Sequence, residues 1–176
     1  IELQWRPISG RRIQPDQEPC VKELFRDSLK IPNSKVRLLS PEDNLLQVCL
    51  HTAKHSFVRA PGFRLHTDVE RIVRAYEIDW DVFCNKVEKI NAKTPVYIAL
   101  LIPNEVFQVS IPSYVFKRLN QNKLKNFILI SWIKRVGIFG PHEKKWSKIG
   151  FIFFNVLLFD SFKDLFKTIF PSKSSL

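Results

Sequence analysis

The sequence predicts a mainly α-helical protein with a short β element at its N-terminus. Residues 1–6 alternate apolar and polar side chains at period two, as a half-buried strand does, and turn residues follow at 7–12. Most of the remaining chain repeats apolar residues at three- and four-residue spacing, which is typical of amphipathic helices. Of the 176 residues, 45% are apolar and five are glycine, so we expect a buried core and not general disorder.

Two helices with an extended piece between them are expected next. Residues 18–29 carry apolar side chains at helical spacing, and the turn residues 31–34 end this helix. A short extended segment is predicted at 35–39. Ser40-Pro41-Glu42-Asp43 then opens a helix, because it combines a hydroxyl N-cap, a proline at the first helical position and acids that face the helix dipole. We expect that helix to run to about Phe57.

The rest of the chain is expected to be helical between short breaks. Pro61-Gly62 is a firm break. Ile149 to Phe159 is nearly uncharged, but its eleven residues are about half of what a membrane-spanning helix needs. We therefore expect no span, and instead a final amphipathic helix that packs on the body of the protein, with binding to anionic lipid as the alternative. The predicted helices cover about 65–76, 80–91, 95–107, 112–119, 123–136 and 146–170.

The net charge of +11 is concentrated in the C-terminal half of the chain. Residues 1–88 hold 14 Lys+Arg against 13 Asp+Glu, whereas residues 89–176 hold 14 against 4. Such asymmetry favours an anionic partner, which could be nucleic acid, an acidic membrane or polyphosphate. A solvated basic face without a specific partner is the alternative.

The three cysteines indicate a reducing compartment. Cys20, Cys49 and Cys84 lie far apart and include no C-x-x-C spacing, so we expect reduced, buried thiols and no disulfide or zinc site. Polar residues interrupt the start of the chain, which excludes a cleavable signal sequence there and makes the cytoplasm the expected location. The chain starts at Ile1 and contains no methionine, so we interpret it as a piece of a longer protein.

Residues 51–68 hold three of the four histidines and are the strongest candidate site. His51 and His55 are four residues apart and share a helix face, as two metal ligands would. The residue after His51 is Thr52, so the H-E-x-x-H pattern of zinc proteases is absent. Each histidine could instead cap a helix or form a hydrogen bond in the core, and Asp68 could be a first-turn acid that favours its helix dipole.

Convergence of charge favours a functional site over these structural roles. One group of donors lies at the end of a helix, and a second group lies on the loop and at the next helix start. A tight Pro-Gly connection would bring the two together into a pocket suited to phosphate. The residues are His51, Lys54 and His55 in the first group, and Arg59, Arg64, His66 and Asp68 in the second.

Four motifs occur in order along the chain: Leu39-Ser40-Pro41-Glu42-Asp43, then Leu50-His51-Thr52-Ala53-Lys54-His55, then Asp68 within a helix, then Ile78-Asp79-Trp80-Asp81. Their order and spacing resemble the uncharacterised bacterial nucleotidyltransferase family that is often found beside surface-polysaccharide genes. Ile1-Glu2-Leu3-Gln4-Trp5 also resembles the family's E-L-H-W strand, with glutamine where histidine is usual. Leu158-Phe159-Asp160 and Phe170-Pro171-Ser172 resemble its final helix and exit.

The resemblance implies a two-metal phosphoryl-transfer chemistry. Nucleotidyltransferases of this fold hold two Mg²⁺ ions on three carboxylates, two of them in a D-x-D strand after a Gly-Ser turn. This chain has no Gly-Ser turn, and its D-x-D, Asp79-Trp80-Asp81, opens a helix, where a cap and a first-turn acid explain it. The resemblance thus implies that the catalytic pair lies upstream of Ile1. Glu2 could supply the third carboxylate, catalytic and metal-binding, or be an exposed acid on a strand.

Under this resemblance residues 1–39 would be the end of the α+β nucleotidyltransferase core, and residues 40–176 a helical domain that closes over the nucleotide. The full-length enzyme would transfer a nucleoside monophosphate from a nucleoside triphosphate to an unknown acceptor hydroxyl, and the fragment alone would be inactive. Lys54 and Arg64 would contact phosphate, and His51 and His55 would form hydrogen bonds in the cleft. Asp68 would position or deprotonate the acceptor.

Two other classes of function stay open. In a nucleic-acid-binding helical module, the basic residues within 123–148 would track phosphates while Phe127, Trp132, Phe139 and Trp146 provide stacking platforms. In a structural or toxin-neutralising partner protein, the amphipathic tail would dock onto another chain.

Overall fold

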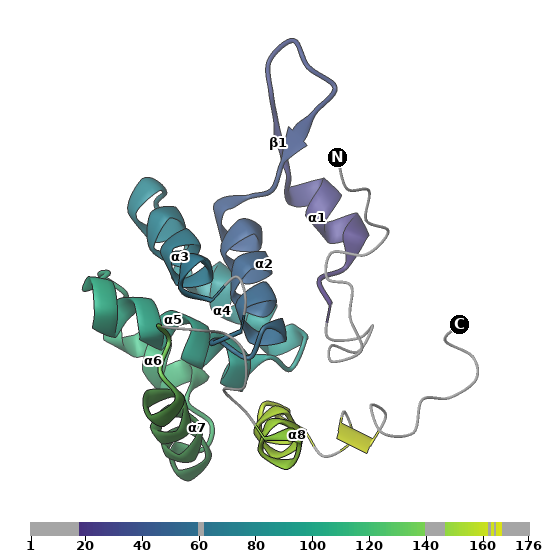
Figure 1. The fold of residues 1–176 in the computed structure, drawn as a ribbon. Coiled ribbons are helices and arrows are strands. Elements are labelled where there is room, and N and C mark those ends of the chain that lie inside the picture. Colours follow the sequence, from purple (N-terminus) through teal and green to yellow (C-terminus); the bar gives the residue numbers. More distant parts are fainter. Residues whose placement is uncertain (1–17, 60–61, 140–146, 162, 164, 167–176) are drawn as a thin grey trace.

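The computed structural model describes residues 18–59, 62–139, 147–161, 163 and 165–166 of the chain. This part is mainly helical with a short antiparallel two-stranded element near its start, which confirms the predicted fold class. The strand predicted at 1–6 lies outside the described residues. The elements are α1 Val21–Asp27, β1 Leu29–Lys30, β2 Arg37–Leu38, α2 Pro41–Lys54, α3 Phe63–Ala75, α4 Trp80–Lys89, α5 Lys93–Phe107, α6 Ser113–Leu119, α7 Lys123–Val136 and α8 Lys148–Leu157 (Figure 1).

Helix α5 lies at the centre of the helical body and packs against α2, α3, α4, α6 and α7. Three consecutive residues of α5, Ile98, Ala99 and Leu100, are fully buried. A helix that is apolar on all sides must be enclosed by others, which explains its central place. The amphipathic helices α2 and α3 cover it, and the β1–β2 hairpin projects from the end of the body opposite α7 and α8 (Figure 1).

The first helix is shorter than its apolar spacing predicts. It ends at Asp27, and Leu29 pairs with Leu38 across the antiparallel hairpin. The Ser28 hydroxyl donates to the carbonyl of Phe25 at 2.6 Å, and Nη2 of Arg37 donates to the carbonyl of Ser28 at 3.0 Å. These bonds engage backbone carbonyls where a further helical turn would form. The extended segment predicted at 35–39 is confirmed as β2.

Capping sets the starts of α2 and α4 as the sequence predicts. The Ser40 hydroxyl accepts from the backbone N–H of Asp43 at 3.1 Å, with Pro41 at the first helical position. The Asp79 carboxylate accepts from the backbone N–H groups of Asp81 and Val82 at 3.1 and 3.0 Å. The D-x-D motif is therefore a helix start, as expected.

The final helix is not the continuous one predicted over 146–170. Helix α8 ends at Leu157, and Asp160 then turns back onto the start of α5. Both carboxylate oxygens of Asp160 lie 3.1 Å from the backbone nitrogen of Thr94, and one lies 3.3 Å from Nζ of Lys125. The residue before α5, Ala92, has no side chain that can cap, so Asp160 supplies the cap and the helix must end before it.

Two of the three cysteines are buried as expected. Burial raises the pKa of the Cys49 and Cys84 thiols, which favours the protonated form. Cys20, predicted to be buried, is exposed at the start of α1, where the short helix offers it no cover. Within the described ranges, no helix combines the length and the apolar character needed to cross a bilayer.

Candidate functional site

The candidate site is built on the way α2 ends. The backbone N–H of Ser56 donates to the carbonyl of Ala53 at 2.8 Å, and that of Phe57 donates to the carbonyl of Thr52 at 3.1 Å. This pair of bonds is a Schellman motif, which normally places glycine where Ser56 stands. Ser56 and Phe57 both have positive φ, 51° and 64°. The sequence predicts a helix to Phe57 because it lacks that glycine signal, whereas α2 ends at Lys54.

The connection between α2 and α3 is held by short-range bonds. The backbone N–H of Arg59 donates to the carbonyl of His55 at 3.1 Å, and that of Gly62 to the carbonyl of Arg59 at 2.6 Å. Gly62 has φ 61° and ψ −124°, a conformation essentially restricted to glycine, and α3 starts directly after it. The end of α2 is thereby held close to the start of α3.

The predicted residues of α2 share one face. His51 and Lys54 lie in its last turn and His55 is its C-cap; the rings of the two histidines are 4.8 Å apart. Burial lowers the pKa of His51, and the charge of Lys54 lowers it further, while the carboxylate of Asp68 acts in the opposite direction. The charges of Lys54 and Asp68 thus both act on the His51 imidazole. The structure places the His51 and His55 rings side by side at the end of α2, with Asp68 on the following helix α3.

Asp68 lies deeper in its helix than the sequence suggests. Helix α3 starts at Phe63, two residues before the predicted start, so Asp68 is in the second turn and the first turn holds no acid. Because a helix dipole acts mainly within the first turn, it does not explain a carboxylate here. Arg64 is exposed and lies four residues before Asp68, so the two share a face of α3.

Two residues of the predicted convergence have structural roles instead. His66 is fully buried, and its Nε2 lies 2.8 Å from the carbonyl of Phe57, so it supports the connection from inside and does not face solvent. Arg59 is exposed, and its guanidinium lies 5.0 Å from the ring centre of Phe151 on α8. That cation–π contact joins α8 to the α2–α3 connection.

Metal ligands are not evident in the part of the chain that the structure describes. No group of three His, Cys, Asp or Glu side chains there is arranged to hold a metal ion. Glu2, the predicted third carboxylate, lies outside the described residues. The described residues therefore do not by themselves fit the Mg²⁺ site that the resemblance implies.

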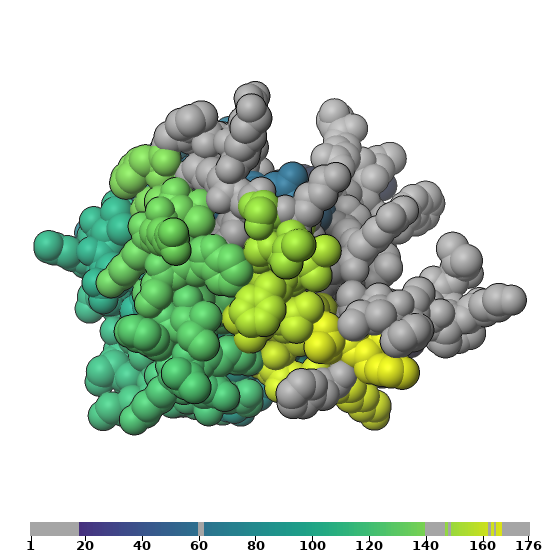
Figure 2. Space-filling view, turned by 60° about the horizontal axis from the view of Figure 1, so that its bottom comes forward, coloured from purple at the N-terminus to yellow at the C-terminus, as the bar shows by residue number. Residues whose placement is uncertain are grey.

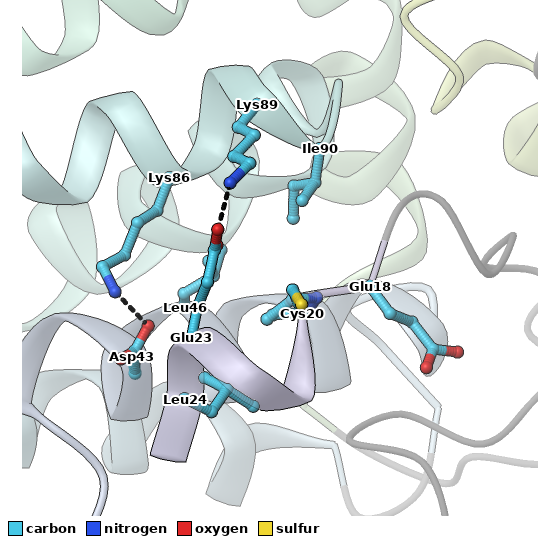
Figure 3. Close-up of a pocket in the computed structure, with 10 residues that line it drawn as sticks. Glu18, Cys20, Glu23, Leu24, Asp43, Leu46, Lys86, Lys89 and Ile90 are labelled. Carbon is cyan, nitrogen blue, oxygen red and sulfur yellow. Dashed lines mark hydrogen bonds and ion pairs between the residues drawn. The ribbon is translucent and has the colours of Figure 1, made fainter. Parts of the chain in front are cut away.

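A cavity of about 270 Å³ lies at the opposite end of α2, between α1, α2 and α4 (Figure 3). Nζ of Lys86 lies 2.8 Å from the Asp43 carboxylate, and Lys89 pairs with Glu23 across the same space. Both cations are thus neutralised by carboxylates, which disfavours an anionic ligand. The cavity does not contain the predicted site residues. Its lining is Glu18, Pro19, Cys20, Glu23, Leu24, Asp43, Leu46, Lys86, Lys89 and Ile90.

The family motifs at the starts of α2 and α4 are in direct contact. The Glu42 carboxylate accepts from the backbone N–H of Asp79 at 3.0 Å. The S-P-E-D and I-D-W-D stretches thus cap their own helices and join the two helix starts to each other. These two motifs therefore hold the helix starts in place. Neither motif belongs to the charged cluster at the α2–α3 junction.

Residues 1–108 match the model of a protein family described as an uncharacterised nucleotidyltransferase. The match covers more than half of the chain and includes every predicted site residue. The chain therefore belongs to this nucleotidyltransferase family, which confirms the resemblance. Membership implies a nucleotide substrate and, in general, a divalent metal. The stretches 158–160 and 170–172, which also entered the resemblance, lie beyond the matched residues. No curated protein and no solved structure matches the chain.

Proposed function

We propose that this chain supplies nucleotide- and acceptor-facing residues of an enzyme that transfers a nucleoside monophosphate from a nucleoside triphosphate to an acceptor hydroxyl. The observation that supports this proposal is the pair of adjacent histidine rings, His51 and His55, at the α2–α3 junction inside the family region, where the charges of Lys54 and Asp68 act on His51. The main metal-binding carboxylates are assigned to residues outside this chain, because its D-x-D motif caps α4.

Phosphate is bound by the cationic side chains of the junction. Lys54 and Arg64 stand on the two helices that meet there, so each can offer a charge-assisted hydrogen bond to a different phosphate oxygen. His51 is half-buried and its pKa is lowered by burial, so its imidazole is neutral at pH 7 and can donate from one nitrogen while it accepts at the other. His55 adds a second ring 4.8 Å away.

Asp68 acts on the acceptor. Its carboxylate orients the acceptor hydroxyl and takes its proton as the hydroxyl oxygen forms a bond to the α-phosphorus, while pyrophosphate leaves. Glu2 remains the predicted third carboxylate of the metal site.

Nucleotide binding and turnover of the full-length protein test this proposal. Lys54→Ala should weaken binding of a nucleoside triphosphate about tenfold or more, because a charge-assisted hydrogen bond contributes roughly 1.5–3 kcal/mol. Asp68→Asn should lower kcat by about 10²–10⁴-fold and leave the nucleotide Kd within about twofold, because a general base acts on the acceptor and not on nucleotide binding.

Matched controls are exposed charges on other helices. Lys117→Ala on α6 and Glu105→Gln on α5 should leave both Kd and kcat unchanged. Calorimetry with each of the four common nucleoside triphosphates and release of pyrophosphate provide the two readouts. Wild-type values for both Lys54→Ala and Asp68→Asn would remove the α2–α3 junction from the active site.

A further inference from the structure

Helices α7 and α8 expose large apolar side chains in regular rows. On α7, Leu124 is 70% exposed, Phe127 68% and Ile128 38%; on α8, Ile149 is 82% exposed, Ile152 63% and Phe153 52%. In each helix the three residues follow the i, i+3, i+4 spacing, so they lie on one face. Single exposed apolar residues need no explanation, but two such rows on adjacent helices indicate an interaction surface.

Trp132 joins the two rows. It follows Leu124 and Ile128 at four-residue intervals along α7, and its ring centre lies 5.9 Å from that of Phe153 on α8. The two helices approach closely here, since a Cβ on Gly150 would lie only 3.1 Å from Cζ2 of Trp132. Figure 2 shows α7, in green, and α8, in yellow-green, side by side on the same side of the molecule. We call these seven residues the α7–α8 apolar face.

Exposed basic residues lie on α7, the helix that carries part of this face. Lys123, Lys134 and Arg135 are exposed on α7, and the structure shows no ion pair for any of them with another described residue. The sequence from 123 to 176 holds ten Lys+Arg against three Asp+Glu. One of those acids, Asp160, is already paired with Lys125. A partner that binds this face must therefore offer an apolar environment for the exposed apolar side chains and negative charge for the basic ones.

We propose that the α7–α8 apolar face docks on the surface of a membrane that contains anionic lipid. A second copy of this chain would bring two positive surfaces together, and a nucleic acid offers no apolar medium for Leu124, Ile149 and Ile152. An anionic bilayer satisfies both features, because apolar side chains enter the acyl boundary while lysines and arginines contact headgroups. In this arrangement the face lies on the membrane surface, and no helix among the described residues is long and apolar enough to cross the bilayer.

Vesicle co-sedimentation of the full-length protein tests the proposal. Wild-type protein should bind vesicles of phosphatidylcholine mixed with phosphatidylglycerol, bind pure phosphatidylcholine vesicles at least about tenfold more weakly, and lose binding as salt rises. The double variants Ile149→Ser/Ile152→Ser and Lys134→Glu/Arg135→Glu should each lower the partition coefficient at least about tenfold. All four side chains are exposed, so the fold should survive, and the circular dichroism spectra should match that of the wild type.

Matched controls are Val106→Ser on α5 and Lys117→Glu on α6, which change an exposed apolar and an exposed basic residue away from this face. They should bind vesicles as the wild type does. Equal binding to neutral and anionic vesicles, or wild-type binding by Ile149→Ser/Ile152→Ser, would overturn the proposal. So would a dimer in analytical ultracentrifugation that this variant abolishes, because the face would then belong to a second copy. Nucleotide binding at the α2–α3 junction is independent of each of these outcomes.

Discussion

Strain and burial gather at the α2–α3 junction. Ser56 and Phe57 both adopt left-handed backbone conformations, which cost non-glycine residues on the order of 1 kcal/mol or more each. Tertiary contacts hold them there: Phe57 is fully buried against the edge of Phe154, and the Ser56 hydroxyl donates to the side-chain oxygen of Asn155 at 3.4 Å. Such strain is concentrated at functional sites in many proteins, which fits the proposed role of this junction.

His66 should make the stability of the protein sensitive to mild acid. Burial lowers its pKa below the unfolded value of about 6.5, and although its hydrogen bond to the Phe57 carbonyl opposes this, the net direction is downward. A group with a depressed pKa in the folded state binds its proton more tightly when unfolded. Below about pH 6.5 the unfolded state gains protons first, so the free energy of unfolding should fall as pH drops from 7.5 to 5.

Urea unfolding at several pH values measures this effect. His66→Phe should have a flatter dependence on pH than the wild type, whatever its absolute stability, because the titrating group is gone. His51→Gln serves as the comparison and should flatten the profile less, since His51 is only half-buried. An unchanged slope in His66→Phe would show that the buried imidazole is not the acid-sensitive group.

At the scale of elements, the start of α5 depends on a residue that follows α8. Asp160 is 4% exposed, accepts from the backbone N–H of Thr94 and pairs with Lys125, which is 16% exposed. It therefore joins α5, α7 and the end of α8 at one point. Lys125 also donates to the carbonyl of Phe159 at 3.1 Å, which fixes the turn after α8.

Asp160→Asn should lower the free energy of unfolding by about 1.5–3 kcal/mol, because it weakens the cap and leaves the Lys125 ammonium largely buried without its carboxylate. Asp81→Asn is the control, since Asp81 also pairs with an arginine, Arg118, but is 73% exposed. That exposed pair should contribute less than about 1 kcal/mol. Chemical denaturation of both variants measures the difference, and equal losses would contradict the capping role of Asp160.

At the scale of the whole molecule, ion pairs link α1 to the helical body. Nζ of Lys86 on α4 lies 2.8 Å from a carboxylate oxygen of Asp27 on α1 and 2.8 Å from one of Asp43 on α2, and Lys89 pairs with Glu23. These contacts cross the predicted boundary between residues 1–39 and 40–176, which itself remains a prediction. Movements of α1 and of α4 are therefore coupled through Lys86.

Lys86→Met should destabilise the protein by about 3 kcal/mol, because the Asp43 carboxylate, 2% exposed, would keep only its contact with the Ser40 hydroxyl. Hydrogen exchange should also become faster in α1, which loses the Asp27 contact. Lys117→Met, an exposed lysine on α6, should change stability by less than about 0.5 kcal/mol. If the amides of α1 in Lys86→Met were as well protected from hydrogen exchange as in the wild type, Lys86 would not couple α1 to α4.

Much of the fold follows from signals that are local in the sequence. Ser40, Asp79 and the apolar spacing of residues 123–136 predict their helices well, because a cap or a helix face involves residues within four positions of each other. The adjacent rings of His51 and His55, four positions apart on α2, could be predicted for the same reason. Placing His66 among the exposed donors was wrong, because its burial depends on how α3 packs and not on its neighbours in sequence.

The sequence by itself determined the helical class, most helix starts, the basic C-terminal half and the membership of a nucleotidyltransferase family. Only the tertiary structure decided where α1, α2 and α8 end, which donors face solvent, and that Asp160 caps a helix 66 residues before it in the chain. Helix starts are capped by adjacent residues and can be seen in a short window. Helix ends, burial and long-range caps depend on partners that only the folded chain brings into contact.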